Sequence, residues 1–348
     1  MQKNILNFKM GKVLNFGELL LRICPDPEGD WLKENSLPFF VGGAELNVAT
    51  ALALWGIPSA YMTSLPKNLL TDQVVAYVND LGIDTSTIQY QGDRIGLYYL
   101  HKGKDLKNAG VIYDRANSSF ATLKTGVIDW DMAFKDVSWF HFSAICPALS
   151  QVTAELCEEA LKEATSRNIT ISIDLNYREK LWKYGKEPIE IMPELVKYCD
   201  VVMGNVWAAE KMLGIPVAEN LSVEADKSAY LEQAEQSSKM IIEKFPKCRA
   251  VANTFRFDHL QGVKYYSTLF KANKLYVSKQ YYAAKILDKV GSGDCYMAGL
   301  IYGFSLNKEP KELVDFATAA GFSKLFIASD ATTLKPEEIK ERVEKYEN

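Results

Sequence analysis

Strands and helices alternate through the middle of the chain, and this alternation constrains the fold more than any other feature. We predict strands at residues 139–143, 169–174, 201–204 and 250–254 and helices at 153–166, 193–198, 207–213 and 231–245. Such alternation is typical of a parallel sheet that is covered by helices on both faces. Ligands of these sheets bind beyond the carboxyl ends of the strands. Polar residues follow the predicted strands at residues 15–18, Ser143, residues 174–178, Asn205 and residues 254–256.

A glycine loop leads into an apolar helix near the end of the chain, where residues 288–294 read DKVGSGD. Glycine lets the backbone approach a ligand closely, and the unpaired N–H groups of a helix start favour an anion. Asp294, in the first helical turn, is either a plain cap or a general base beside a docked phosphate. The loop lacks the lysine of a P-loop and the third glycine of a dinucleotide fingerprint. Taken alone, it leaves both readings open.

A second glycine element, Gly42-Gly43, stands before an almost wholly apolar helix at residues 48–55. Glu45 and Asn47 are polar residues at the mouth of this helix. They are either helix caps and buried polar side chains with hydrogen-bond partners inside the protein, or groups that bind a hydroxyl-rich ligand. If this element and the late glycine loop serve one ligand, both must line the same pocket.

Alternating segments at residues 87–90, 95–100 and 110–114, together with residues 19–41, predict a small separate sheet. Such a sheet is too thin to fold alone and has to cover something. An alanine-rich helix at residues 310–328 is expected to pack against the helix that begins at Asp294.

Composition excludes several classes of function. The 348 residues carry a net charge of −4, which gives no reason to expect nucleic acid or a membrane as a partner. The six cysteines are scattered without metal-binding spacing, which predicts reduced thiols and a cytoplasmic protein. Residues 1–10 do not resemble a signal peptide.

The two glycine elements, in this order, resemble those of the ribokinase-like sugar kinases, the phosphofructokinase-B family. Residues 113–118 (YDRANS) and 174–178 (DLNYR) are closer still to one branch, the 2-keto-3-deoxygluconate kinases. The resemblance implies an α/β fold, a three-layer α/β/α sandwich with a mostly parallel central sheet and a small β-sheet lid. We therefore expect a kinase domain at 11–334, a lid from about 19–41 and 91–118, and an N-terminal extension at 1–10.

The resemblance also implies a reaction, transfer of the ATP γ-phosphoryl group to a sugar hydroxyl. Asp294 would accept the hydroxyl proton, and the N–H groups of Gly291, Ser292 and Gly293 would bind the charge on the moving phosphoryl group. The implied substrate contacts are Gly42, Gly43, Ala44, Glu45, Asn47, Tyr98, Tyr113, Arg115, Arg178 and Asp330. The implied nucleotide contacts are Asn176, Arg178, Asn205, Thr254, Arg256, Gly291 and Gly293.

Arg115 and Arg178 are suited to a sugar acid, because a guanidinium group matches a carboxylate with two parallel hydrogen bonds. Without the resemblance, Arg115 reads equally well as a solvated lid residue. The expected cofactors are ATP and Mg²⁺, with a monovalent cation left open. Mg²⁺ would bridge the phosphates mostly through water, so no metal-ligating residue is expected. The resemblance further implies a homo-oligomer that associates through the lid.

The chain departs from the family pattern in three places. Residues 290–294 (VGSGD) replace the usual Thr-Gly-Ala-Gly-Asp but keep both glycines and the aspartate. Ala208 stands where the family's Asn-x-x-Glu motif, here beginning at Asn205, has its acid. Residues 253–257 (NTFRF) replace the glycine-containing nucleotide loop. The leading hypothesis is an ATP-dependent kinase that converts 2-keto-3-deoxygluconate to its 6-phosphate. The alternatives are a fructokinase or another neutral-sugar kinase, and a non-catalytic sugar-binding regulator, against which the retained Asp294 argues.

Overall fold

The protein is seen here in a computed structural model that describes residues 11–24, 36–100, 110–219, 221, 226–259 and 262–346. Its central sheet contains β1 (Lys12–Phe16), β4 (Ser59–Met62), β6 (Ile83–Asp84), β10 (Val137–Ser143), β11 (Thr170–Asp174), β12 (Val201–Gly204), β13 (Ala250–His259), β14 (Gly262–Lys271), β15 (Lys274–Val277) and β16 (Tyr281–Ala283). The strand order is β15-β14-β13-β12-β11-β10-β1-β4-β6, and β16 pairs with β14. The neighbours from β6 to β13 are parallel, whereas the pairs that β14 makes are antiparallel. The mostly parallel sheet is as predicted.

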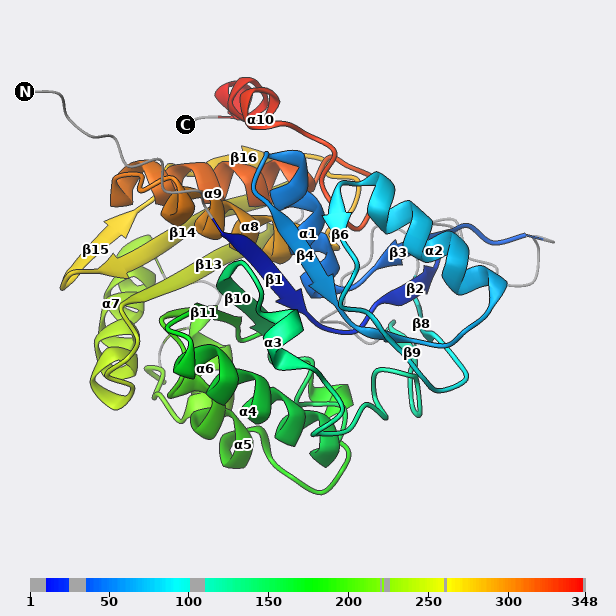
Figure 1. The fold of residues 1–348 in the computed structure, drawn as a ribbon. Coiled ribbons are helices and arrows are strands. Elements are labelled where there is room, and N and C mark those ends of the chain that lie inside the picture. The colour runs from blue at the N-terminus through cyan, green and yellow to red at the C-terminus, as the bar shows by residue number, and fades with distance from the viewer. Residues whose placement is uncertain are drawn as a thin grey trace, which may run out of the picture.

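Helices cover both faces of this sheet and complete three layers (Figure 1). One face carries α1 (Ala44–Leu54), α8 (Ser292–Ser305), α9 (Pro310–Lys324) and α10 (Pro336–Val343), with α2 (Leu69–Asp80) beside α1. The other face carries α3 (Trp130–Ala133), α4 (Gln151–Ser166), α5 (Pro188–Val196), α6 (Val206–Leu213) and α7 (Lys227–Lys244). Two short 3₁₀ turns, η1 (Glu179–Leu181) and η2 (Glu344–Tyr346), complete the regular elements of the described residues.

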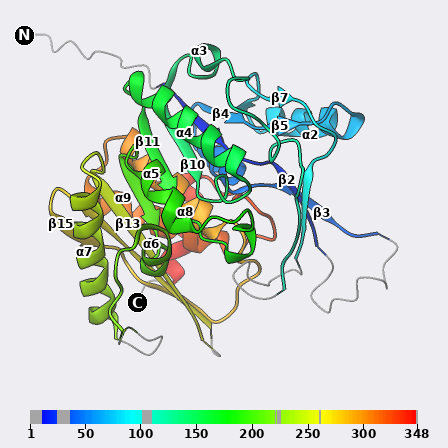
Figure 2. The same cartoon turned by 90° about the horizontal axis from the view of Figure 1, so that it is seen from below.

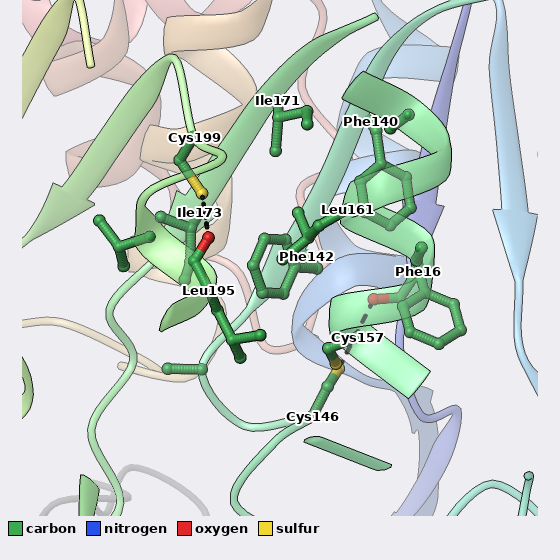
Figure 3. Packing of buried hydrophobic residues seen from close by; sticks show 14 of the residues in the cluster. Phe16, Phe140, Phe142, Cys146, Cys157, Leu161, Ile171, Ile173, Leu195 and Cys199 are labelled. Carbon is green, nitrogen blue, oxygen red and sulfur yellow. Dashed lines mark hydrogen bonds between the residues drawn. The ribbon is translucent and has the colours of Figure 1, made fainter. Parts of the chain in front are cut away.

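Each face of the sheet has its own hydrophobic core. On the α4 side, Phe16, Phe140 and Phe142 are fully buried, and their rings stack with centroids 6.1 and 6.0 Å apart (Figure 3). Cys146 and Cys157 are buried thiols in the same core. Strands buried on both faces explain the continuous apolar runs in the sequence.

A small sheet stands to one side of the central sheet (Figure 2). It has four strands in the order β3-β2-β8-β9, namely β3 (Phe39–Gly42), β2 (Leu20–Ile23), β8 (Gly96–Tyr99) and β9 (Ile112–Asp114). A separate small sheet is as predicted, but the placement of residues 87–90 in it was wrong. That segment forms β7 (Gln89–Tyr90), which pairs with β5 (Ser64–Leu65) as a two-stranded sheet of its own.

Several element boundaries differ from the predicted ones, and two of these differences have a clear physical reason. Helix α5 starts at Pro188, where Glu187 and Glu190 form a capping box, and Pro193 lies inside it rather than at its start. Proline is common in the first helical turn, and the sequence offers two such prolines. Strand β13 runs to His259 rather than ending at 254, because β14 pairs with it along its whole length.

The alanine-rich helix packs against the helix of the glycine loop, as predicted. A Cβ at Gly299 of α8 would come within 2.6 Å of the Ala317 Cα of α9, so the two backbones touch. Ile339 and Val343 of α10, which lies beyond residue 334, are buried in the same core. Among the helices in the described part of the chain, none combines the length and apolar character that a bilayer span requires.

Candidate active site

A cavity opens at the carboxyl ends of the parallel strands. The segments after β11 and β12, the far half of β13, the glycine loop, the start of α1 and the small sheet all contribute to its wall. Most of the site residues that the sequence predicts do line this cavity. They are Gly43, Ala44, Asn47, Tyr98, Tyr113, Arg115, Asn176, Arg178, Asn205, Thr254, Arg256, Gly291, Ser292, Gly293 and Asp294. The two glycine elements therefore meet in one pocket, as the sequence interpretation requires.

Asp294 joins these two elements directly. Its Oδ2 accepts a hydrogen bond of 2.7 Å from the Asn47 side-chain amide, which belongs to α1. Burial raises the pKa of Asp294 from 3.8 to about 7, against the lowering effect of that hydrogen bond. A nearby buried carboxylate, Glu45, raises it further, and Arg178 lowers it. Near neutral pH this carboxyl group is thus poised to exchange a proton.

The glycine loop is pressed against the protein on one side and open on the other. Gly291, the N-cap of α8, has φ +76°, and a Cβ there would lie 1.7 Å from the backbone oxygen of Asp330. At Gly293 a Cβ would meet only the Met203 side chain, at 4.0 Å. The open side faces the cavity, so an anion can approach the N–H groups of the α8 start there.

A buried ion network lies behind this loop. The Arg22 guanidinium donates to Asp288 at 2.8 Å and pairs with Asp330 at 2.7 Å, and all three side chains are almost fully buried. Tyr98 donates its hydroxyl to Asp330 at 2.8 Å. Asp288 in turn accepts the Val290 N–H at 3.0 Å and so fixes the turn before Gly291. Although burial opposes the Arg22 charge, Asp330, Tyr98 and Asp288 raise its pKa.

Three predicted substrate residues do not line the cavity. The carboxylate of Asp330 is engaged by Arg22 and Tyr98, and Gly42 packs so closely on it that a Cβ would come within 2.4 Å of Oδ2. Glu45 lies in the interior, where it accepts the Ser143 N–H at 3.0 Å, and burial raises its pKa.

Arg115 lines the cavity but already has a carboxylate partner. Its Nε donates to Glu18 at 2.7 Å, and the Ser118 hydroxyl donates to the other Glu18 oxygen. Arg178, which follows β11, donates to the backbone oxygen of Tyr177 at 3.0 Å. This pair could not be predicted from the sequence, because Glu18 is distant from Arg115 along the chain.

Asn205 serves first as a helix cap. Its side-chain oxygen accepts the Ala208 N–H at 2.8 Å and starts α6. The same residue lines the cavity, so a further role toward a ligand would fall to the side-chain amide nitrogen.

Several lining residues were not predicted as site residues. They are Leu20, Ile145, Asp174, Leu175, Tyr177, Met203, Gly204, Tyr265, Lys289 and Val290. Lys289 and Val290 stand inside the glycine motif, and Asp174 ends a predicted strand, so their positions carried a usable signal. Tyr265 belongs to β14, which was not predicted as a strand.

Comparison with known proteins now decides the family. Residues 10–326 match the pfkB family carbohydrate kinases. The chain belongs to this family. It is therefore a carbohydrate kinase, with the ribokinase-like fold, and the family uses ATP with Mg²⁺.

Individual relatives are named as kinases of keto-deoxy sugar acids. The crystal structure of 2-dehydro-3-deoxygluconokinase from Thermotoga maritima is 32% identical, with a TM-score of 0.86 over 96% of this chain and 99% of that one. A 2-dehydro-3-deoxygalactonokinase from Haloferax volcanii is 35% identical over 172 residues, which is 49% of this chain and only about half (54%) of that relative. A 5-dehydro-2-deoxygluconokinase from Clostridium botulinum is 26% identical over 88% of this chain and 86% of its own.

Proposed function

We propose that this kinase phosphorylates a hydroxyl group of a 2-keto-3-deoxy sugar acid, foremost 2-keto-3-deoxygluconate at its 6-position, with Asp294 as general base. One observation carries the proposal: a buried carboxyl group with a pKa of about 7 lies beside the open face of an anion-binding loop. The names of the two relatives above 30% identity support the substrate class.

The proton chemistry follows from the two side chains that meet at this point. Asn47 donates to one oxygen of Asp294, which leaves the other oxygen to accept the proton of the attacking hydroxyl group. The N–H groups of residues 291–293 balance the negative charge that builds on the transferred group. Such alignment and charge balance is most of what phosphoryl transfer requires from a protein.

The lining residues fit ATP. Asn176, Thr254, Arg178 and Arg256 bring hydrogen-bond donors and positive charge to the nucleotide side of the loop. Among the described residues no cluster of three His, Cys, Asp or Glu side chains is arranged to hold a metal ion. Mg²⁺, when bound, would offset part of the phosphate charge, and the lining residues would hold it mainly through water.

The sugar-acid carboxylate is assigned to Arg115 and Arg178. The pairing of Arg115 with Glu18 favours a second candidate, a neutral-sugar kinase, since this guanidinium group already has a countercharge. A panel of sugar acids, ketoses and aldoses in an ADP-release assay separates the two. We expect turnover on the acids, and turnover on neutral sugars alone would refute the sugar-acid assignment. No turnover on any acceptor would indicate a non-catalytic regulator.

Substitution of Arg115 tests the same assignment at one residue. For Arg115→Gln we expect the KM for the acid to rise at least about 10-fold while the KM for ATP stays within about twofold, because a charge-assisted hydrogen bond is lost only on the acceptor side. Arg94→Gln is the matched control. Arg94 also belongs to the small-sheet region and pairs with Asp114, but it does not line the cavity. An unchanged acid KM in Arg115→Gln would contradict the assignment.

We also propose that the small sheet, within the predicted lid segments 19–41 and 91–118 of a domain spanning 11–334, is the lid and the contact between copies of a cytoplasmic homo-oligomer. Phe39 and Ile112 on its outer strands are 52% and 58% exposed, so each outer strand offers a large apolar side chain to a second copy. Light scattering after size exclusion would show a multiple of 39.1 kDa. A monomer at micromolar concentration would refute the association.

A further inference from the structure

Two cationic side chains, Arg256 and Lys289, line the cavity next to the glycine loop. Strand β13 carries the first of them past the edge of the parallel sheet. Its pairing with β12 ends at Asn253, whereas its pairing with β14 continues to His259. Because side chains alternate along a strand, Thr254, Arg256 and Asp258 share one face of this extension.

Lys289 reaches the same extension from the glycine loop. Its Nζ donates to Asp258 Oδ2 at 2.8 Å, and its side chain is only 19% exposed. The Arg256 Nε lies 3.8 Å from the other oxygen of Asp258. Both cations therefore face the carboxylate of Asp258, which is itself 43% exposed.

The position of Lys289 puts its charge within reach of an anion on the loop. Two peptide units separate Lys289 from Gly291, so their Cα atoms are at most about 7.6 Å apart. The ammonium group stands at the end of a flexible four-carbon stem with three donors, and Asp258 takes one of them. An anion held by the N–H groups at the start of α8 lies within the span of such a side chain.

We propose that Lys289 binds the phosphates of ATP together with Arg256, as a side-chain clamp specific to the polyphosphate. Arg256 belongs to residues 253–257, the segment that stands in place of the family's glycine-containing nucleotide loop. The inference rests on the proposed function, since it names the residues that hold the ATP of that reaction.

Calorimetric titration of the full chain with ATP and with adenosine, both in the presence of Mg²⁺ and without any sugar, tests the clamp. For Lys289→Met we expect ATP binding to weaken about 10-fold or more, the effect of one lost charge-assisted contact. Adenosine binding should stay within about twofold, because adenosine carries no phosphate. Lys289→Arg should retain most of the ATP affinity. Lys285→Met, an exposed lysine four positions earlier that does not line the cavity, is the matched control.

Three outcomes would overturn the clamp: unchanged ATP affinity in Lys289→Met, an equal loss of ATP and adenosine binding, and absence of ATP binding in the wild-type chain. Nucleotide binding needs no acceptor. A wild-type chain that binds ATP but never turns over a sugar acid therefore counts against the proposed substrate and not against Lys289.

Discussion

The substitution Asp294→Asn should abolish turnover and at the same time stabilise the protein. Asparagine has nearly the same shape, and its oxygen can still accept the hydrogen bond that Asn47 donates at 2.7 Å. What disappears is the ability to take a proton. General-base catalysis contributes roughly 10²–10⁴-fold, so kcat should fall by at least about 100-fold.

The stability gain can be worked from the pKa. Burial raises the pKa of Asp294 from 3.8 to about 7, so the folded state holds this proton more tightly than the unfolded chain. The group therefore leaves stability unchanged below about pH 4 and lowers it progressively as pH rises from 3.8 to about 7. The difference of about three pH units corresponds to roughly 4 kcal/mol above pH 7, and asparagine removes this penalty.

Urea unfolding of wild type and variant at pH 4 and pH 8 measures the effect. We expect equal midpoints at pH 4 and a higher midpoint for Asp294→Asn at pH 8. Asp93→Asn, an exposed aspartate outside the cavity, should change neither stability nor turnover. A variant no more stable than wild type at pH 8 would refute the burial argument. Turnover within about fivefold of wild type, far from the roughly 100-fold loss expected of a base, would refute the catalytic role.

Three further outcomes are expected. In wild type, kcat/KM should rise with pH through about 7 and then level off, because only ionised Asp294 accepts the proton; a flat profile from pH 5.5 to 8.5 would contradict this. Gly291→Ala should eliminate soluble folded protein or activity, since its Cβ would lie 1.7 Å from the Asp330 backbone oxygen. Its control is Gly56→Ala, where φ is +78° and nothing lies within 4 Å of the added Cβ; its free energy of unfolding should fall by only about 1 kcal/mol in a melting experiment. Arg22→Met should lower the free energy of unfolding by about 3–5 kcal/mol, because two buried aspartates lose their cation; a loss below about 1 kcal/mol would show that they are not charged together.

The sequence predicted what is encoded locally. The alternation of strands and helices specifies the parallel sheet, and the DKVGSGD loop, picked out as a candidate site, lines the cavity together with Asp294. Both signals depend on residues that are neighbours along the chain. The length of β13 could not be predicted in this way, since it is set by pairing with β14 rather than by the composition of residues 255–259.

The pairing of buried charges could not be predicted from the sequence either. Glu45 and Asp330 were predicted to contact substrate, yet their carboxylates are engaged by groups from other segments. Glu18 and Arg22 were not predicted as partners at all, although they neutralise Arg115 and Asp288. An ionisable residue at a strand end fits a ligand contact and an internal ion pair equally well until the fold shows which countercharge is near.

The Arg22 network has a consequence for how the protein is made. Arg22 and Asp288 are 266 positions apart, and a ribosome delivers the chain from its amino end. The first strands of the small sheet therefore emerge long before the aspartates that neutralise their arginine. The nascent chain has to leave that arginine in water until its aspartate partners have been synthesised, so the turn that Asp288 fixes before Gly291 can be assembled only at the end of translation.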